Sequence, residues 1–358
     1  MPAKPSTRQY LGRLKRMARG GKRAVIVLQN NPDPDAIASA AALKLLFKEL
    51  ADCDAVVAYG GVVGRAENRT MLKYLGLSMR NVEDAPLERF DVVAMVDTQP
   101  GFGNNPIDDH TQADVVIDHH ERAQRMPGIR LCDIRPNYGA TSTILAEYLL
   151  EAGIVPPMAL ATALAYGIQS DTQDFGRETS EADINMYTRL YPIANKRLLS
   201  RIEYEQEPRE YFTEVSRALR EARTYGNIGI SWLGRTINPD MTGEIADFLV
   251  RCDEVDWALC QGLYKGTLYL SIRSDFRNVN ADRLMRSLVE GLGVGGGHEM
   301  IAGGQIKIER DSLKAANQFR KQVERRFLEH FQLDPKNRRL LVSRAGERVG
   351  KNGAGNGK

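Results

Sequence analysis

Residues 24–39 read AVIVLQNNPDPDAIAS, and this stretch decides the fold. It begins with a short β-branched run, turns at an Asn/Pro-rich segment that carries Asp33 and Asp35, and continues into an Ala/Leu-rich segment that reaches Leu50. A strand, an acidic turn and a long helix in this order are typical of a parallel α/β sheet. We therefore predict a strand at 24–29 and a helix at about 35–50.

Further apolar runs follow, with room for helices between them. In the first half of the chain we predict strands at 54–59, 90–97 and 113–118 and helices from about 139 and at 159–170. Because these strands are apolar without interruption, the sheet should be parallel and covered on both faces. A second α/β unit begins at Asn227, with strands predicted at 228–233, 255–263 and 267–272 and helices at 241–251, 280–291 and 313–331.

The composition places the chain among ordinary folded proteins. Its 358 residues predict two domains, and 42% hydrophobic residues exclude a wholly disordered chain. No apolar run approaches the ~20 residues that a membrane span needs, and the N-terminus has no signal-peptide pattern, so we expect no membrane attachment. The four cysteines form no C-x-x-C pair, which predicts a reducing, cytoplasmic setting and no zinc site.

Charge is distributed unevenly along the chain. Residues 1–23 carry +8 and residues 336–358 carry +6, which leaves −11 for the residues between them. We expect both basic ends to be solvated and mobile, with a role in steering anionic ligands as the alternative, and the Gly/Asn-rich tail to be disordered. An acidic body does not indicate a general nucleic-acid-binding surface, but it can concentrate carboxylates for a metal. The polar stretch at 203–223 is interpreted as a helical connector.

Carboxylates and histidines gather where predicted strands end. Three strands and the helix at 159–170 each end in such residues: Asp33, Asp35, Asp97, Asp118, His119, His120 and Asp171. The carboxyl ends of parallel strands share one edge of the sheet, so these side chains should converge. So many carboxylates require a compensating cation, and oxygen ligands with one or two imidazoles suit Mn²⁺, Mg²⁺ or Fe²⁺.

Each of these residues alone has an ordinary structural alternative. A single Asp after a strand usually caps a helix or a turn, and this applies to Asp97, Asp33 and Asp35. Two adjacent histidines at a strand end are less easily explained in that way, because the chain has only five histidines. Taken together, the residues predict a divalent-metal site. Two such metals sharing one carboxylate would form a phosphoester-hydrolysis site.

These motifs, taken in order, resemble those of the DHH phosphoesterase family, in its subfamily with a DHHA1 domain. The resemblance rests on the triplet Asp118-His119-His120, the first motif at 31–39, Val96-Asp97, and Ser170-Asp171-Thr172. Gly295-Gly296-Gly297-His298, followed by Ala302-Gly303-Gly304, looks like the DHHA1 signature, and 271–274 (SIRS) resembles its Arg-bearing strand. The match covers roughly residues 20–335.

The resemblance implies a two-lobed α/β fold. It places a parallel-sheet DHH domain at 24–202, a helical connector at 203–225 and a smaller α/β DHHA1 domain at 226–335. The basic segment at 1–23 and the basic tail at 336–358 flank these domains.

The resemblance also implies roles for individual residues. Asp33 and Asp97 would hold a first metal, and a second would be held by Asp35, Asp97, His119 and Asp171, with Mn²⁺ expected and Mg²⁺ as the alternative. Asp118 would orient the histidines, and His120 would lie near the phosphate as a donor. The substrate would be held by Arg273, Ser274, Gly296, Gly297 and His298, because a guanidinium and closely approaching backbone N–H groups suit phosphate.

One position departs from the family pattern. The first motif usually opens with His where this chain has Gln29. A glutamine carbonyl ligates Mn²⁺ less strongly than an imidazole does. We therefore expect a first metal site that is weaker, prefers Mg²⁺ or stays empty.

The resemblance leads to a ranked set of functions. First comes a cytoplasmic metal-dependent phosphoesterase for small nucleotides or very short oligonucleotides, as in the stand-alone nanoRNase and 3′-phosphoadenosine-5′-phosphate phosphatase branch. The alternatives are a soluble cyclic-dinucleotide phosphodiesterase and a nucleotide-binding regulatory protein whose catalysis Gln29 weakens. A family II inorganic pyrophosphatase is less favoured, because that family lacks the GGGH segment. We expect no long duplex nucleic acid as partner, and a homodimer remains open.

Overall fold

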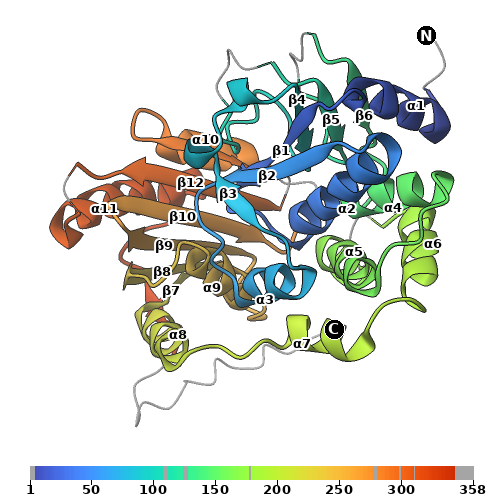
Figure 1. Ribbon diagram of the computed structural model, residues 1–358. Coiled ribbons are helices and arrows are strands. Elements are labelled where there is room, and N and C mark those ends of the chain that lie inside the picture. The colour runs from blue at the N-terminus through green and yellow to red at the C-terminus, as the bar shows by residue number, and fades with distance from the viewer. Residues whose placement is uncertain are drawn as a thin grey trace. The chain divides into compact units, whose positions relative to one another are not determined.

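The computed structural model describes residues 5–107, 112–123, 128–176, 179–276, 280–297, 300–309 and 311–342 (Figure 1). The chain divides into two compact units, the first ending at Gln206 and the second beginning at Glu207. Within the described residues, no helix combines the length and the apolar character that crossing a membrane requires.

A six-stranded, all-parallel sheet organises the first unit, in the order β3-β2-β1-β4-β5-β6. Its strands are β1 (Arg23–Asn30), β2 (Asp54–Gly60), β3 (Met79–Asn81), β4 (Val92–Val96), β5 (Val115–Asp118) and β6 (Leu131–Ile134). Strands β2 and β3 follow β1 toward one edge of the sheet. The chain then returns to the other side of β1, where β4, β5 and β6 follow one another toward the opposite edge. The topological switch point, where parallel sheets bind ligands, therefore lies between β1 and β4.

Both faces of this sheet are covered, as the apolar strands predict, but by different kinds of structure. On β1, Ala24, Ile26 and Leu28 pack against helices, whereas Val25 and Val27 face a thinner layer. The helices are α1 (Thr7–Ala18), α2 (Pro34–Ala51), α3 (Ala66–Leu75), α4 (Thr141–Glu151), α5 (Met158–Asp171), α6 (Glu181–Leu190) and α7 (Lys196–Glu203). The thinner layer includes the short helices η1 (Val82–Asp84) and η2 (Leu87–Arg89) and neighbouring loops.

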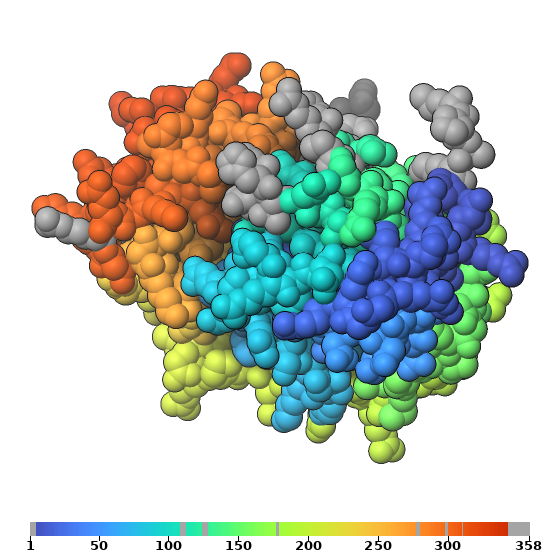
Figure 2. Space-filling model, turned by 45° about the horizontal axis from the view of Figure 1, so that its top comes forward, coloured from blue at the N-terminus to red at the C-terminus, as the bar shows by residue number. Residues whose placement is uncertain are grey.

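Within the described part of the basic N-terminal segment, residues 5–23, the chain forms helix α1 and enters β1, so the prediction of a mobile end is wrong for these residues. Ser6 and Gln9 form a capping box at the start of α1, and the helix buries Tyr10, Leu11 and Leu14. The Tyr10 hydroxyl donates to the Cys132 carbonyl at 3.1 Å. Figure 2 shows α1, in dark blue, on the surface of the first unit. The basic residues lie on the outer side of the helix. They make the segment polar in composition, although its inner side is apolar.

Removing the buried side chain of Leu14 tests this packing. Leu14 is 1% exposed, so Leu14→Ala should lower the free energy of unfolding by about 2–5 kcal/mol through lost burial and the cavity left behind. Arg13→Ala, on the exposed side of the same helix, is the control and should change stability little. Urea unfolding monitored by circular dichroism measures both. Equal stability of the two variants would show that α1 does not belong to the core.

The second unit is a mixed seven-stranded sheet in the order β11-β12-β10-β9-β8-β7-β13. Its strands are β7 (Arg223–Tyr225), β8 (Ile228–Arg235), β9 (Trp257–Tyr264), β10 (Thr267–Ser274), β11 (Val294–Gly297), β12 (Ile301–Lys307) and β13 (Arg339–Leu340). Only the β8–β9 pair is parallel among these pairings. Two helices, α8 (Arg209–Glu221) and α9 (Met241–Leu249), pack on one face, and α10 (Ala281–Val289) and α11 (Leu313–His330) on the other.

Most of the segment predicted as a connector belongs to this second unit. Ala218 of α8 is fully buried, and its carbonyl accepts a hydrogen bond from the Ser231 hydroxyl of β8 at 2.7 Å. The basic tail also contributes, since β13 pairs with β7. The remainder of the tail, residues 343–358, lies outside the described residues.

Candidate metal centre

The predicted metal ligands of the first unit meet at the switch point of the sheet. Asp33 is the N-cap of α2 and Asp35 lies in the first turn of that helix, Asp97 follows β4, and β5 ends at Asp118. Two groups of side chains each bring their ligand atoms within 4.8 Å of one another: Asp97, Asp118, His119 and His120, and Asp35, His119 and Asp171. The structure therefore places near one another residues as far apart in sequence as Asp35 and Asp171, which are separated by 136 positions.

Asp97 occupies a strained backbone position. Its φ is 60°, in the left-handed region that Asp and Asn tolerate better than most other residues. The side chain is 2% exposed and accepts a hydrogen bond from the Thr141 hydroxyl at 3.0 Å. Such strain at a buried carboxylate is typical of a functional position.

Asp35 is fixed by the start of helix α4. Its two carboxylate oxygens accept the backbone N–H groups of Thr141 and Ser142, each at 2.7 Å. The N-cap residue of α4, Ala140, has no capping side chain, so Asp35 caps this helix from a distant part of the chain. Helix α5 can approach because it has Gly167 here, where a Cβ would lie 3.2 Å from the Asp35 Cα.

His119 is oriented as metal-binding histidines usually are. Its Nδ1 lies 3.1 Å from the Tyr138 carbonyl oxygen, which only accepts, so Nδ1 carries the proton. Its Nε2 then points to Asp171 Oδ2 at 3.1 Å and to Asp97 Oδ1 at 3.6 Å. A carbonyl that holds Nδ1–H in this way leaves Nε2 as the ligand atom. Asp171 ends α5, where the helix dipole disfavours a carboxylate, and this supports a functional role.

Asp118 lies behind the histidines. It is fully buried; its Oδ1 accepts from His120 Nδ1 at 2.7 Å and from the His119 backbone N–H at 2.8 Å. Burial opposes its ionisation, but the charge and hydrogen bond of His120, with further help from His119 and Gln99, lower the pKa of Asp118. This is the geometry of a residue that orients the histidines rather than one that ligates.

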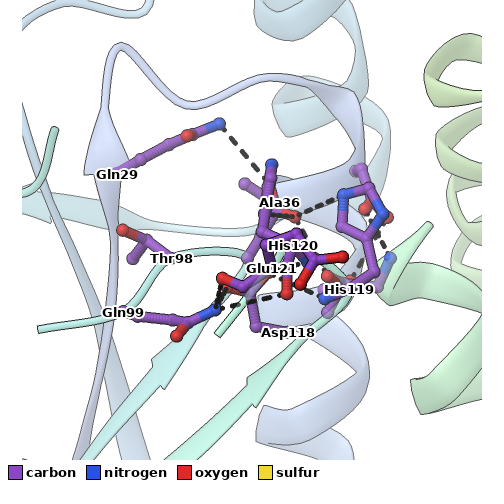
Figure 3. Close-up of polar contacts among 12 residues, drawn as sticks. Gln29, Ala36, Thr98, Gln99, Asp118, His119, His120 and Glu121 are labelled. Atoms are coloured by element: carbon purple, nitrogen blue, oxygen red, sulfur yellow. Dashed lines mark hydrogen bonds and ion pairs between the residues drawn. The ribbon is translucent and has the colours of Figure 1, made fainter. Parts of the chain in front are cut away.

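Gln99 was not found by the sequence analysis. It is fully buried; its Nε2 donates to Asp118 Oδ2 at 2.7 Å and to the Glu121 carbonyl at 3.1 Å, while its Oε1 accepts from Ala123 N–H at 2.8 Å. Figure 3 shows Gln99 beside Asp118 and Glu121. The side chain thus fixes both the carboxylate and the loop after the histidines. Its position two residues after Asp97 was the only feature of the sequence that could have pointed to Gln99.

The electrostatics of the cluster call for a cation. Burial and repulsion from Asp171 raise the pKa of Asp33 and raise that of Asp35 to about 7. Burial, with Asp33 and Asp35, raises the pKa of Asp97 well above its usual value. Burial lowers the pKa of His119, but Asp171 and other carboxylates outweigh it and raise that pKa to about 10. Carboxylates with one imidazole fit a hard divalent cation, so these residues are suited to the metal that the motifs predict.

We expect metal uptake at this centre to release protons. The His119 imidazolium and the Asp35 carboxyl group, with pKa values of about 10 and about 7, must lose protons before they can ligate. Mn²⁺ binding near pH 7 should therefore release protons from His119, Asp35 and Asp97, whose pKa values are all raised, and apparent affinity should rise with pH through this range. Calorimetric titrations in two buffers of different ionisation enthalpy measure the release. A pH-independent affinity with no proton release would contradict the assignment.

In the second unit, the predicted substrate residues are held by internal contacts. Arg273 is 8% exposed; its Nε donates to the Asp247 carboxylate and its Nη1 to the Ser271 hydroxyl at 2.7 Å. Ser274, at the end of β10, accepts from Phe276 N–H at 3.1 Å.

The glycine run lies in strand β11. Gly296 pairs with Gly303 of β12, and Gly297 donates its N–H to Asp282 at 2.9 Å. A Cβ on Gly297 would lie 2.2 Å from the Ile301 carbonyl oxygen, so close strand packing requires glycine there. His298, the other predicted substrate residue, lies outside the described residues.

Comparison with known families agrees with this two-unit arrangement. Residues 23–168 match the DHH family, N-terminal domain, and residues 226–328 match the DHHA1 domain. The chain therefore belongs to the DHH family of metal-dependent phosphoesterases, with a DHHA1 domain as its second unit.

Individual relatives extend this result. An uncharacterized protein of Methanocaldococcus jannaschii is 35% identical over 285 residues, which cover 79% of this chain and 58% of that protein. The chain thus spans little more than half of that relative's length. A probable manganese-dependent inorganic pyrophosphatase of Streptococcus agalactiae is 30% identical over 244 residues, or 65% of this chain and 75% of that protein.

Solved structures show the same fold at low identity. An exopolyphosphatase-related protein from Bacteroides fragilis has a TM-score of 0.66 at 16% identity, covering 89% of this chain and 96% of the other. RecJ from Thermus thermophilus in complex with Mn²⁺ has a TM-score of 0.51 at 15% identity, covering 91% of this chain and 55% of RecJ.

Proposed function

We propose that this protein hydrolyses phosphoester bonds of small nucleotides or very short oligonucleotides, with Mn²⁺ held by Asp35, Asp97, His119 and Asp171. The observation that carries the proposal is the orientation of His119. Its Nε2 is fixed by the Tyr138 carbonyl and faces Asp171 and Asp97. Mg²⁺ is the alternative ion, since it shares the preference for oxygen ligands.

The remaining side chains support this chemistry in distinct ways. A divalent cation held by Asp35, Asp97, His119 and Asp171 would supply an activated water for attack on phosphorus. The resemblance gives His120, whose Nδ1 contacts Asp118 Oδ1 at 2.7 Å, the role of a donor to a phosphate oxygen. In the second unit, the resemblance gives the phosphate contact to Arg273, because a planar guanidinium is suited to a phosphate group.

Pyrophosphate is the second candidate substrate. The 30% identity to a probable manganese-dependent inorganic pyrophosphatase favours it. The DHHA1 match over residues 226–328 supports the nucleotide proposal instead, because the resemblance gives family II inorganic pyrophosphatases a different second domain, without the GGGH segment. A cyclic dinucleotide remains the alternative among nucleotides, and a binding protein with weak catalysis the alternative of another class.

A substrate panel tests the proposal directly. Purified protein with Mn²⁺, Mg²⁺ or EDTA is incubated with a short RNA oligonucleotide, 3′-phosphoadenosine 5′-phosphate, a cyclic dinucleotide and pyrophosphate. We expect Mn²⁺-dependent turnover of the oligonucleotide or of the nucleoside bisphosphate. Exclusive turnover of pyrophosphate would establish the second candidate, and nucleotide binding without any turnover would establish the binding protein.

Replacing Arg273 separates binding from chemistry. Arg273→Gln removes a cation from the predicted phosphate contact and should raise KM by about 10–100-fold with little change in kcat. Arg235→Gln, which breaks an exposed ion pair with Asp311 in the same unit, is the control and should change neither. Steady-state kinetics on the active substrate measure both constants. A change confined to kcat would place Arg273 at the reacting phosphate instead.

A further inference from the structure

The side chain of Gln29 presents its nitrogen, not its oxygen, to the carboxylates. Its Nε2 donates to Asp33 Oδ2 at 2.7 Å and lies 3.4 Å from Asp97 Oδ2. Figure 3 shows this nitrogen directed toward the centre of the site. Asp33 and Asp97 are the two carboxylates that the family pattern assigns to a first metal. The amide N–H groups therefore lie between the oxygens that this metal would share.

A chain of hydrogen bonds sets the orientation of this amide, and backbone groups fix its far end. Asn105 Nδ2 donates to the Gln99 carbonyl at 2.8 Å, and Asn105 Oδ1 accepts from Ile107 N–H at 3.2 Å. A backbone carbonyl only accepts and a backbone N–H only donates, so the Asn105 amide has one permitted orientation. Its Nδ2 also donates to the Thr98 hydroxyl at 3.1 Å.

Further hydrogen bonds from Thr98 through Asn104 then determine the orientation of the Gln29 amide. The Thr98 hydroxyl, which accepts from Asn105, donates to Asn104 Oδ1 at 2.8 Å. Asn104 is thereby turned so that its Nδ2 donates to Gln29 Oε1 at 3.3 Å. With its oxygen occupied by Asn104, Gln29 can offer the carboxylates only N–H donors. A donor group cannot ligate a cation, so the residues present at the first position do not fit a metal.

We propose that the Gln29 amide replaces the first metal ion, so that this protein binds a single divalent cation, at Asp35, Asp97, His119 and Asp171. The proposal rests on the metal-dependent activity proposed above and adds the number of ions. The Gln29 amide donates hydrogen bonds to Asp33 and Asp97 in place of a cation. Asn104 is the positioning residue, because its hydrogen bond to Gln29 Oε1 keeps the amide nitrogen directed at these carboxylates. A second Mn²⁺ should bind at least about 100-fold more weakly than the first, because it must displace these hydrogen bonds and lacks an imidazole ligand.

Counting ions tests the proposal without reference to turnover. Metal-free full-length protein is titrated with Mn²⁺ by calorimetry, and bound Mn is counted by mass spectrometry after desalting. We expect one tight ion in the wild type. Electron paramagnetic resonance should show an isolated Mn²⁺ rather than a spin-coupled pair.

Three variants should create the missing site. Gln29→His restores an imidazole, and Gln29→Glu places acceptor oxygens at nearly unchanged shape; both should bind a second tight ion and show a coupled pair. Asn104→Asp removes the donor to Gln29 Oε1, so the Gln29 amide should rotate and direct its oxygen at the carboxylates. The affinity for a second Mn²⁺ should then rise at least about tenfold. Gln9→Glu carries the same charge change on α1, retains the capping acceptor and should keep one ion.

The outcomes separate this inference from the proposed function. Two tight ions in the wild type, or one ion in the wild type and in all three folded variants, would overturn the role of Gln29. If the same preparation turns over a nucleotide, the proposed function stands while the inference falls. A wild type with no tight ion and no turnover would overturn both.

Discussion

Asp97→Asn should reduce turnover on the order of 10³-fold or more while the protein stays folded. The substitution removes the buried charge that faces His119 Nε2, and metal stabilisation of a phosphoester transition state contributes several kcal/mol. Asparagine keeps the shape of the side chain and tolerates the φ of 60° found here, so the backbone need not change. Turnover of the best panel substrate with saturating Mn²⁺ measures the effect.

The control for this experiment is Asp84→Asn, an exposed carboxylate on η1. It makes the same chemical change in the same unit and should leave turnover unchanged. Thermal unfolding of both variants shows whether the fold is retained. A folded Asp97→Asn protein with near-normal turnover would remove Asp97 from the metal centre.

His119→Ala should weaken Mn²⁺ binding at least about 100-fold and abolish measurable turnover at ordinary Mn²⁺ concentrations. It removes the only imidazole whose Nε2 faces both Asp171 and Asp97 among the described residues. Loss of a partner that merely orients a ligand already costs about 10–100-fold in affinity, so loss of the ligand itself should exceed that. Calorimetric titration gives the affinity, and proton release should fall in parallel.

The control is His330→Ala, which removes an imidazole that packs edge-to-face against Phe331 in the second unit. Its Mn²⁺ affinity should equal that of the wild type. Unchanged Mn²⁺ affinity of His119→Ala would mean that the cation is held elsewhere.

Much of the sheet could be predicted because its strands are continuous apolar runs. Each predicted strand of the first half has its counterpart among β1, β2, β4 and β5, and each predicted helix of the second half among α9, α10 and α11. The short strands β3 and β6 were missed, since three or four residues give little periodicity. Helix α1 was missed because its basic residues outweigh the apolar stripe, although Ser6 and Gln9 already form a capping-box pattern.

The candidate site could be predicted as a set of residues but not as a hydrogen-bonding pattern. Strand ends indicated that Asp97 and His119 would meet, because parallel strands share an edge. The orientation of Gln29 could not be foreseen, since it depends on Asn104 and Asn105, about seventy-five residues away in the chain and carrying no motif. The Gly-rich run was interpreted as a segment whose backbone N–H groups approach a phosphate. Its place in strand β11 could not be foreseen, because consecutive glycines also permit tight strand packing.

The long-range capping of α4 by Asp35 has a consequence for folding kinetics. The hydrogen bond joins residues 106 positions apart, and the contact between Asp97 and Thr141 spans 44. Contacts of such separation close large loops and form late in folding. A cation therefore meets a complete set of ligands only after the sheet, α4 and α5 have assembled, and it stabilises an arrangement that the folding transition state largely lacks. Metal binding should then act mainly by slowing unfolding, which gives the loaded protein kinetic persistence rather than faster folding.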